Sequence, residues 1–277
     1  MRPLGRGPLP MIGMWRMETI KLVRHKRWLA VIPAFLITTF ISLDNLCAYP
    51  KLELNVWDGI FSTFFNYVYF RFIVLLVFVF LVTDTITGDI SSKWVYLTLS
   101  RCSDRAKWYI TKVASIYSAA LIYSLLGVSI VFLASLTKLP YAGSLSAFST
   151  NPPDLFKAMG TYVIPKGGNP FTLTAQLILY TSFSLGTFAL IPVTLSVIIP
   201  KGQIGMIFSL IWIFISQFFQ SSRTWMKIDI IPRLVYGAFF YPDALLDFSV
   251  SGSLLYLFAV AIGSSIIGIW FVRKADF

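Results

Sequence analysis

Few side chains in this sequence have the chemistry of a catalytic or metal site. His25 is the only histidine, and it lies between Arg24 and Lys26 in a basic run, which is typical of an exposed residue. The HExxH motif, clusters of cysteine with histidine, and pairs of acids within one apolar segment are all absent. No Gly-Lys dipeptide occurs, so the phosphate-binding GxxxxGK[ST] loop cannot form. We therefore expect a chain that is not an enzyme by itself and holds no cofactor or metal. An intramembrane hydrolase is disfavoured.

Many of the charged residues gather in one polar segment, residues 84–112, between two long apolar runs. A plain connection between helices takes about 2–8 residues, so this segment is too long to be only a connector. Its aromatic residues, among them Trp94 and Trp108, could lay a short helix against the membrane surface or a partner. Its charged residues are the basic Lys93, Arg101, Arg105, Lys107 and Lys112 and the acidic Asp84, Asp89 and Asp104. We expect this segment to couple the chain to a partner.

The composition is that of a membrane protein. The chain is 57% hydrophobic and 13% charged with a mean hydropathy of +0.75, whereas a soluble domain has about 25% charged residues. The 23 Lys and Arg against 12 Asp and Glu could suggest a nucleic-acid partner, but these basic residues flank apolar runs instead of forming a soluble basic domain. Cys47 and Cys102 fall on opposite sides of the topology given below, so no intrachain disulfide is expected. We predict an all-α polytopic membrane protein with no nucleic-acid partner.

The apolar runs predict six transmembrane helices in a single membrane domain, residues 28–277. A bilayer core takes about 20 helical residues. The predicted spans are residues 28–43, 64–83, 110–136, 171–199, 204–220 and 253–272, and the predicted outside loops are 44–62, 137–170 and 223–252. Prolines and a glycine interrupt the last loop, which predicts short helices there instead of another span.

The distribution of charge orients these spans. On the side of both termini and the 84–112 segment there are 15 basic and 5 acidic residues, a net charge of 15 − 5 = +10. The rest of the chain has 8 basic and 7 acidic residues, a net charge of 8 − 7 = +1. Because basic residues resist translocation, we predict that both termini and the 84–112 segment are cytoplasmic. The predicted location is the cell membrane, most simply a prokaryotic plasma membrane.

Residues 1–27 are predicted to form an N-terminal tail followed by an interfacial amphipathic helix. Trp15, Leu22 and Leu29 recur every seven residues within a strongly basic stretch, giving an imperfect apolar stripe. Such a stripe fits a helix that lies in the membrane interface. A simple basic anchor that fixes orientation is the alternative interpretation of the same residues.

Polar residues within the predicted spans are few. Arg71 is the single charge in the second span, and it either snorkels to the outer interface, which we favour, or lines a pathway between subunits. Gln176, Gln217 and Gln220 are candidates for the same pathway or for a dimer interface, although helix–helix hydrogen bonds are the more usual role of such residues. No acid lies in the middle of a span, which argues against a carrier coupled to protons or sodium. One isolated charge provides no self-contained hydrophilic route, so we expect two copies or two related chains to act together.

The polar segment carries a pattern that is found in a known family. Residues 89–112 read DISSKWVYLTLSRCSDRAKWYITK. The pattern is E-x-x-x-G-T-x-x-x-L-L-S-R-P-V-S-R, followed by a lysine seven residues after the last arginine. Asp89 falls at its acid and Ser100-Arg101 at its S-R pair. Arg105 falls at the second arginine and Lys112 at the lysine. In this respect the chain resembles the membrane subunits of ABC-2-type exporters, which carry the pattern between spans two and three. The departures are Lys93-Trp94 in place of Gly-Thr and Cys102-Ser103-Asp104 in place of Pro-Val-Ser.

The resemblance implies a permease that forms half of a substrate pathway, together with a second permease copy or a sister permease. Two separate ATP-binding subunits would bind ATP and Mg and drive transport, and the 84–112 segment would be the cytoplasmic coupling helix and its flanks. It also implies an interfacial helix before span one and short helices between spans five and six. We assign ATPase coupling to Asp89, Trp94, Arg101, Arg105 and Lys112, and we expect Asp89 to cap the N-terminal end of the coupling segment.

A second class of function fits the same residues. The chain could be a membrane anchor or sensor subunit that does not transport, and that docks a cytoplasmic partner through residues 84–112. In both classes membrane lipids are partners. A P-loop ATPase encoded in the neighbouring reading frame would separate the two classes in favour of the permease.

Overall fold

The computed structural model describes residues 11–48, 53–94, 104–153, 162–165, 167–199, 203–219, 222–241 and 249–274. Within these ranges the chain is helical and contains no strand. Five helices are long and apolar enough to cross a membrane: Lys26–Cys47, Tyr67–Ser91, Arg105–Ser135, Pro170–Ile198 and Val250–Lys274. The prediction of an all-helical chain with membrane-spanning character is confirmed.

The helix at the sixth predicted position is shorter than the other five. It is α12 (Ile204–Phe218), an apolar helix of 15 residues. At about 1.5 Å per residue it reaches about 22 Å, compared with about 30 Å for the hydrocarbon core of a bilayer. Among the described residues the structure therefore has five apolar helices long enough to span a membrane, and α12 is shorter.

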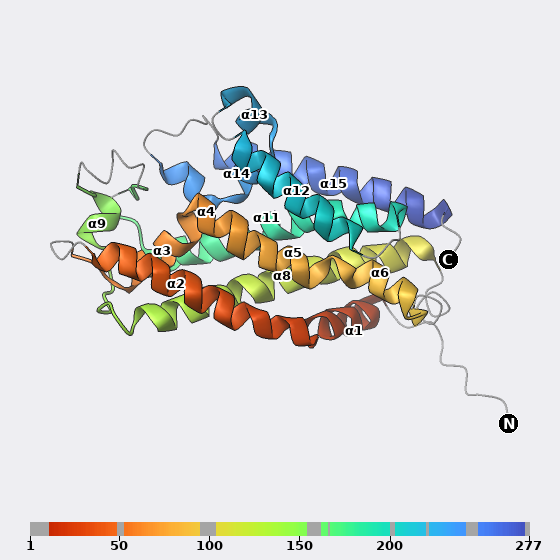
Figure 1. The fold of residues 1–277 in the computed structure, drawn as a ribbon, viewed down its shortest axis with the longest axis horizontal. Coiled ribbons are helices and arrows are strands. Elements are labelled where there is room, and N and C mark those ends of the chain that lie inside the picture. Colours follow the sequence, from red (N-terminus) through yellow and green to blue (C-terminus); the bar gives the residue numbers. More distant parts are fainter. Residues whose placement is uncertain are drawn as a thin grey trace.

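The elements follow one another in the order drawn in Figure 1. Three described stretches depart from α-helical geometry. They are a 3-10 turn at the start of the first long helix, a π-helical turn within the second, and a 3-10 turn between α14 and α15. The bounds are α1 Met11–Val23, η1 Lys26–Ala30, α2 Val31–Cys47, α3 Val56–Phe65, α4 Tyr67–Tyr69, η2 Phe70–Leu75 (the π-helix), α5 Leu76–Val82, α6 Asp84–Ser91, α8 Arg105–Ser135, α9 Ala147–Thr150, α11 Pro170–Ile198, α12 as above, α13 Arg223–Ile228, α14 Ile231–Leu234, η3 Tyr236–Phe240 and α15 Val250–Lys274.

The long helices lie side by side along the longest axis of the molecule (Figure 1). The helix α8 packs against α1, α2, α3, α11 and α15, and α11 is the most deeply buried of the long helices. The helices α1 and α6 lie at one end of the bundle together with the start of α8 and the end of α15, and we call this the charged end. The opposite end holds α3 and α9, and we call it the α9 end.

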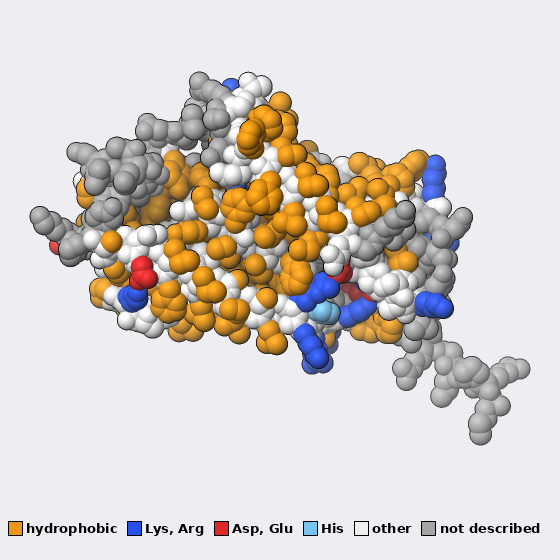
Figure 2. Space-filling model, viewed as in Figure 1, with side chains coloured by type: hydrophobic (Ala, Val, Ile, Leu, Met, Phe, Trp, Pro, Cys, Tyr) orange, Lys and Arg blue, Asp and Glu red, His pale blue; other side chains and the backbone are white. Residues whose placement is uncertain are grey.

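The surface is divided in the same way. Figure 2 shows hydrophobic side chains over most of the visible face, and most of the coloured Lys and Arg side chains lie toward the charged end. An apolar band with basic residues beside it is the pattern of a protein that sits in a bilayer.

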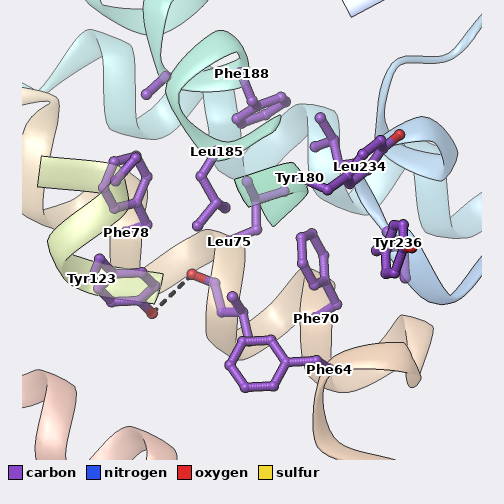
Figure 3. Packing of buried hydrophobic residues seen from close by; sticks show 14 of the residues in the cluster. Phe64, Phe70, Leu75, Phe78, Tyr123, Tyr180, Leu185, Phe188, Leu234 and Tyr236 are labelled. Atoms are coloured by element: carbon purple, nitrogen blue, oxygen red, sulfur yellow. Dashed lines mark hydrogen bonds between the residues drawn. The ribbon is translucent and has the colours of Figure 1, made fainter. Parts of the chain in front are cut away.

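Aromatic rings fill the core between α2, α5 and α8. The ring of Tyr123 lies 5.3 Å from the ring of Phe35 and 5.3 Å from that of Phe78. Its hydroxyl donates to the backbone oxygen of Val74 at 2.9 Å, as Figure 3 shows by a dashed line, so this buried polar atom is satisfied. Gly127 makes room for this packing, because a Cβ there would lie 2.4 Å from the ring of Phe35.

The second predicted span begins differently from the prediction. Residues 56–65, most of which fall in the predicted outside loop 44–62, form the buried helix α3. The chain then breaks at Asn66, whose side-chain oxygen accepts the backbone N–H of Val68 and starts the next helix. An extended backbone at Asn66 ends one helix and its side chain caps the other, so the long helix starts at Tyr67 and not at Phe64.

The apolar stripe predicted for the N-terminal helix reaches only from Trp15 to Leu22, because α1 ends at Val23. The buried residues of α1 are Met14, Glu18 and Leu22, four residues apart, and they face α8. Trp15 is 39% exposed, and Leu29 lies beyond α1 in η1 with 70% exposed. A spacing of four residues keeps side chains on one face of an α-helix, and the acid at position 18 hides this spacing in the sequence.

The two remaining loops contain short helices. The described part of residues 137–170 includes α9, and the stretch 223–252 includes α13, α14 and η3. Short helices in the second stretch were predicted, and the described residues confirm them.

Candidate functional site: a buried ion cluster at the charged end

Three helices bring ionisable side chains together at the charged end. Glu18 lies on the buried face of α1, Asp89 lies near the end of α6, and Lys112 lies in the first part of α8. The start of α8 is fixed separately by Asp104, whose carboxylate accepts the backbone N–H of Ala106 at 3.0 Å. The cluster therefore joins three elements that are distant in the sequence.

The contacts within the cluster are direct ion pairs. The Nζ of Lys112 donates to Oε2 of Glu18 at 2.5 Å and to Oδ2 of Asp89. The other carboxylate oxygen of Asp89 accepts from Nζ of Lys21 on α1. We call Glu18, Lys21, Asp89 and Lys112 the ion cluster.

Burial makes these pairs energetically important. Lys112 is 0% exposed, Asp89 2% and Glu18 4%, whereas the side chain of Lys21 is 47% exposed. The buried members Glu18, Asp89 and Lys112 carry a net charge of −1, and the half-exposed Lys21 brings the cluster to neutrality. Removing one partner of such a buried pair leaves an uncompensated charge, which costs roughly 3–5 kcal/mol.

Aromatic rings lie beside both lysines. The Nζ of Lys112 is 5.6 Å from the ring centre of Trp108, and the Nζ of Lys21 is 5.1 Å from that of Trp94. Cations at this distance from an aromatic face are attracted to it. The half-buried Trp94 is thus close to the ion cluster through Lys21.

A polar cavity of about 410 Å³ borders the ion cluster. A second ion pair contributes to its wall, between Arg27 Nη1 and Asp84 Oδ2 at 2.6 Å. The charged residues of the lining are Glu18, Lys21, Arg27, Asp84, Asp89 and Lys112. Arranged as ion pairs, these groups can bind, orient or lock helices, and they include no nucleophile paired with a base.

The residues predicted to couple the ATPase fall into three groups. Asp89, Trp94 and Lys112 are brought together at the ion cluster. Arg105 begins α8, and its Nη1 donates to the backbone oxygen of Arg273 at 3.5 Å, next to the end of α15. Arg101 lies outside the described residues. The expected capping role of Asp89 is wrong, because Asp89 lies near the C-terminal end of α6 with its carboxylate on two lysines.

Two members of the ion cluster were missed by sequence reasoning. Glu18 and Lys21 were counted only as part of a basic N-terminal stretch. The signal was present in the spacing of Met14, Glu18 and Leu22, where an acid takes a place on an otherwise apolar face. An acid at such a place predicts a buried cation opposite it.

A second polar contact lies within the long helix Tyr67–Ser91. Arg71 is 1% exposed, and its Nη1 donates to Oε1 of Gln217 on α12 at 2.7 Å. The guanidinium lies 5.5 Å from the ring centre of Tyr67. The favoured interpretation that Arg71 snorkels to the interface is wrong, since the side chain is buried between helices.

The other glutamines behave as helix-to-helix donors or acceptors where they are described. Oε1 of Gln176 accepts from the hydroxyl of Tyr236 at 2.9 Å, and Gln217 holds Arg71. Gln220 lies outside the described residues. Arg71 sits in the π-helical turn η2, and such turns are frequent at functional sites, so the Arg71–Gln217 contact is a second candidate position.

No group of three or more His, Cys, Asp or Glu side chains among the described residues is arranged to hold a metal ion. The chain matches no protein-family model and no curated protein sequence.

Proposed function

We propose that this chain is the permease subunit of an ABC-2-type transporter, an exporter in the cell membrane, which is driven by a separate ATP-binding subunit. The observation that carries the proposal is the buried pair between Asp89 and Lys112. These are the two charged positions that open and close the stretch resembling the family pattern, and they contact each other directly. A pattern whose ends pair in space has a structural reason for its spacing.

The pair gives the 84–112 segment a defined mechanical role. Asp89 precedes the connection to α8 and Lys112 follows it, so their ion pair ties the two ends of the connection together. Glu18 adds α1 to the same point. A partner that moves residues between 89 and 112 would move α1, α6 and α8 as one unit.

The proposed topology has six spans with α12 as the short fifth span and with both termini in the cytoplasm. The five long apolar helices and the basic residues gathered at the charged end support this orientation. In this arrangement α13, α14 and η3 occupy the outer leaflet beyond the end of α12, which compensates for its length. Trp212 of α12 donates to Asp229 at 3.0 Å and joins α12 to this group of short helices.

A pathway formed with a second permease would involve Arg71. The side chain is held between the second long helix and α12 by Gln217, and α12 presents Ile207, Ile211 and Phe214 to the outside. A second copy that packs on α12 would change the position of Gln217 and therefore of Arg71. In this proposal Arg71 senses assembly or cargo, and it is not a lipid anchor.

The proposal is tested by purifying the tagged full chain from membranes of its source and identifying what remains bound. We expect a P-loop ATPase at equal stoichiometry and ATP hydrolysis by the purified complex. The variant Lys112→Met should lose the ATPase, whereas Lys138→Gln, which removes the exposed pair with Asp44 at the α9 end, should retain it.

The alternative function gives a different result. A membrane anchor or sensor would retain a partner without a P-loop, and the purified complex would not hydrolyse ATP. That outcome would contradict the permease proposal. The variants Lys112→Met and Lys138→Gln would then still test whether the ion cluster is needed to dock that partner.

A further inference from the structure

An apolar groove of about 490 Å³ lies on the surface of the bundle, between α15 on one side and α8 and α11 on the other. Tyr117 of α8 and Phe183 of α11 form one wall, with their rings stacked at 5.9 Å. The opposite wall is one face of α15, made by Phe258, Ile262, Ile266 and Ile269. The small side chains of Ala261 and Ser265 also line the groove, which leaves room along it.

The length of the groove matches one leaflet of a bilayer. From Phe258 to Ile269 the rise of a helix is about 16 Å at about 1.5 Å per residue. Half of a hydrocarbon core of about 30 Å is about 15 Å. A single extended acyl chain of one leaflet would therefore run along the groove from end to end.

One end of the groove is basic. Arg273 follows Ile269 by four residues, so its side chain continues the same face of α15. Lys274 is exposed and its Nζ lies 3.9 Å from the ring centre of Trp270. Among the described residues no carboxylate forms an ion pair with Arg273 or Lys274.

The neighbouring start of α8 adds to the same charge. Arg105 contacts the backbone of Arg273, and Lys107 is exposed two residues further along α8. The described acid at this position, Asp104, accepts the N–H of Ala106 and caps α8. The end of the groove thus presents the cations of Arg273 and Lys274, with Arg105 beside them, where the headgroup of a lipid would lie.

We propose that this groove binds an anionic glycerophospholipid, with one acyl chain against α15 and the phosphate at Arg273 and Lys274. A second copy of the chain is the other possible occupant of an apolar groove in a membrane. Two copies related by an axis along the membrane normal would place Arg273 and Lys274 at the same depth as their own counterparts. Like charges brought together in this way disfavour the contact, whereas an anionic phosphate complements them.

The proposal is independent of the permease function, because it needs only that the chain spans a membrane. It is tested by native mass spectrometry of the full chain purified in detergent, with dioleoyl phosphatidylglycerol or dioleoyl phosphatidylcholine added at equal concentration. We expect one tightly bound phosphatidylglycerol for each chain. The double variant Arg273→Gln/Lys274→Gln should weaken that binding by about fivefold for each basic residue removed, and phosphatidylcholine binding should not change.

Two apolar variants separate the groove from the general lipid-facing surface. Ile262→Trp fills the groove and should abolish the tight site, whereas Ile207→Trp on the exposed face of α12 should leave it intact. Equal retention of both lipids by the wild type would overturn the proposal. So would an Ile262→Trp variant that dissociates a dimer without altering the bound lipid, since the groove would then be an interface between copies.

Discussion

Asp58 and Asp89 are buried carboxylates at opposite ends of the molecule, and they are compensated in different ways. At the charged end Asp89 pairs with two lysines. At the α9 end Asp58 is 0% exposed and accepts from neutral donors, the backbone N–H of Asn55 at 2.7 Å and the hydroxyl of Ser146 at 2.7 Å, with Ser149 as a third. Among the described residues no ion pair reaches Asp58.

The pKa of Asp58 reflects this environment. Burial in the protein raises the pKa of the carboxyl above its usual value of 3.8, and the hydrogen bonds from Ser149, Asn55 and Ser146 only partly oppose that rise. A group held by neutral donors can lose its charge without leaving a buried cation behind. In the ion cluster each carboxylate pairs with Lys112, so neutralising either one removes a buried ion pair.

The different surroundings of Asp58 and of the ion cluster suit different roles, a structural one for Asp58 and a coupling one for the ion cluster. Asp58 closes a capping box with Asn55 at the start of α3 and accepts from the hydroxyls of Ser146 and Ser149. Asn55 donates to the backbone oxygen of Ser144, so the two residues together fasten the 144–149 stretch to α3. The ion cluster joins three helices beside a polar cavity and beside the segment that resembles a coupling motif. Among the described residues, the ion pairs that join three helices lie at the charged end, where a change in one helix can reach two others through charge.

The largest expected effect is that of Lys112→Ala. The change leaves Glu18 buried without a cation, so the free energy of unfolding should fall by roughly 3–5 kcal/mol. The measurement is chemical or thermal unfolding of the purified chain in detergent. Lys138→Ala is the matched control, because it removes a lysine from an exposed pair that is worth about 0–1 kcal/mol. Equal losses in the two variants would show that the ion cluster is not buried as described.

A smaller effect should distinguish the two carboxylates directly. Asp89→Asn removes a charge that compensates Lys112 and Lys21, and it should destabilise the chain by roughly 1–3 kcal/mol. Asp58→Asn keeps the shape and the neutral partners, so its unfolding free energy should stay within about 1 kcal/mol of the wild type. The same unfolding measurement applies to both. If Asp58→Asn proved the more damaging change, the comparison between the two ends would be reversed.

The smallest effect is a dependence on pH. Because the pKa of Asp58 is higher in the folded chain than in the unfolded one, the folded state binds this proton more tightly. The contribution of Asp58 is therefore fully present below pH 3.8 and is lost as pH rises through the raised pKa. As pH rises through that pKa, the melting temperature of the wild type should fall relative to that of Asp58→Asn. A difference that stays constant with pH would mean that Asp58 is not desolvated.

Much of the helical framework was predictable, because long apolar runs show where a helix can cross a membrane. The runs that became α8 and α11 were placed closely for this reason. The break at Asn66 could not be predicted in this way, because apolar residues continue on both sides of it and only the asparagine marks it. The length of α12 was overestimated by two residues at its C-terminal end, where the described helix stops at Phe218.

The candidate site was predictable only in part. The family pattern identified Asp89 and Lys112 as positions of interest, but their contact depends on how α6 and α8 pack. Glu18 is 94 positions away from Lys112 in the sequence, so no local spacing could pair them. Arg71 was misread because a lone charge in an apolar run does not reveal Gln217, which lies 146 positions further along the chain.

The central claim is that the ion cluster couples the 84–112 segment to α1, α6 and α8, and that Asp58 does not take part. The most direct test compares two variants in the reconstituted complex with its ATPase. One is the neutral triple variant Glu18→Gln/Asp89→Asn/Lys112→Met, in which no buried charge is left unpaired, so that its folding is retained. The other is Asp58→Asn, which alters a buried carboxylate at the far end.

The measurement is the affinity of the ATPase for the membrane-inserted chain, together with the rate of ATP hydrolysis in the complex. The account predicts that the triple variant inserts and folds but binds the ATPase about tenfold or more weakly, a loss of about 1.4 kcal/mol, or hydrolyses ATP without response to the permease. Asp58→Asn should behave as the wild type does. Wild-type affinity and coupled hydrolysis in the folded triple variant would contradict the account.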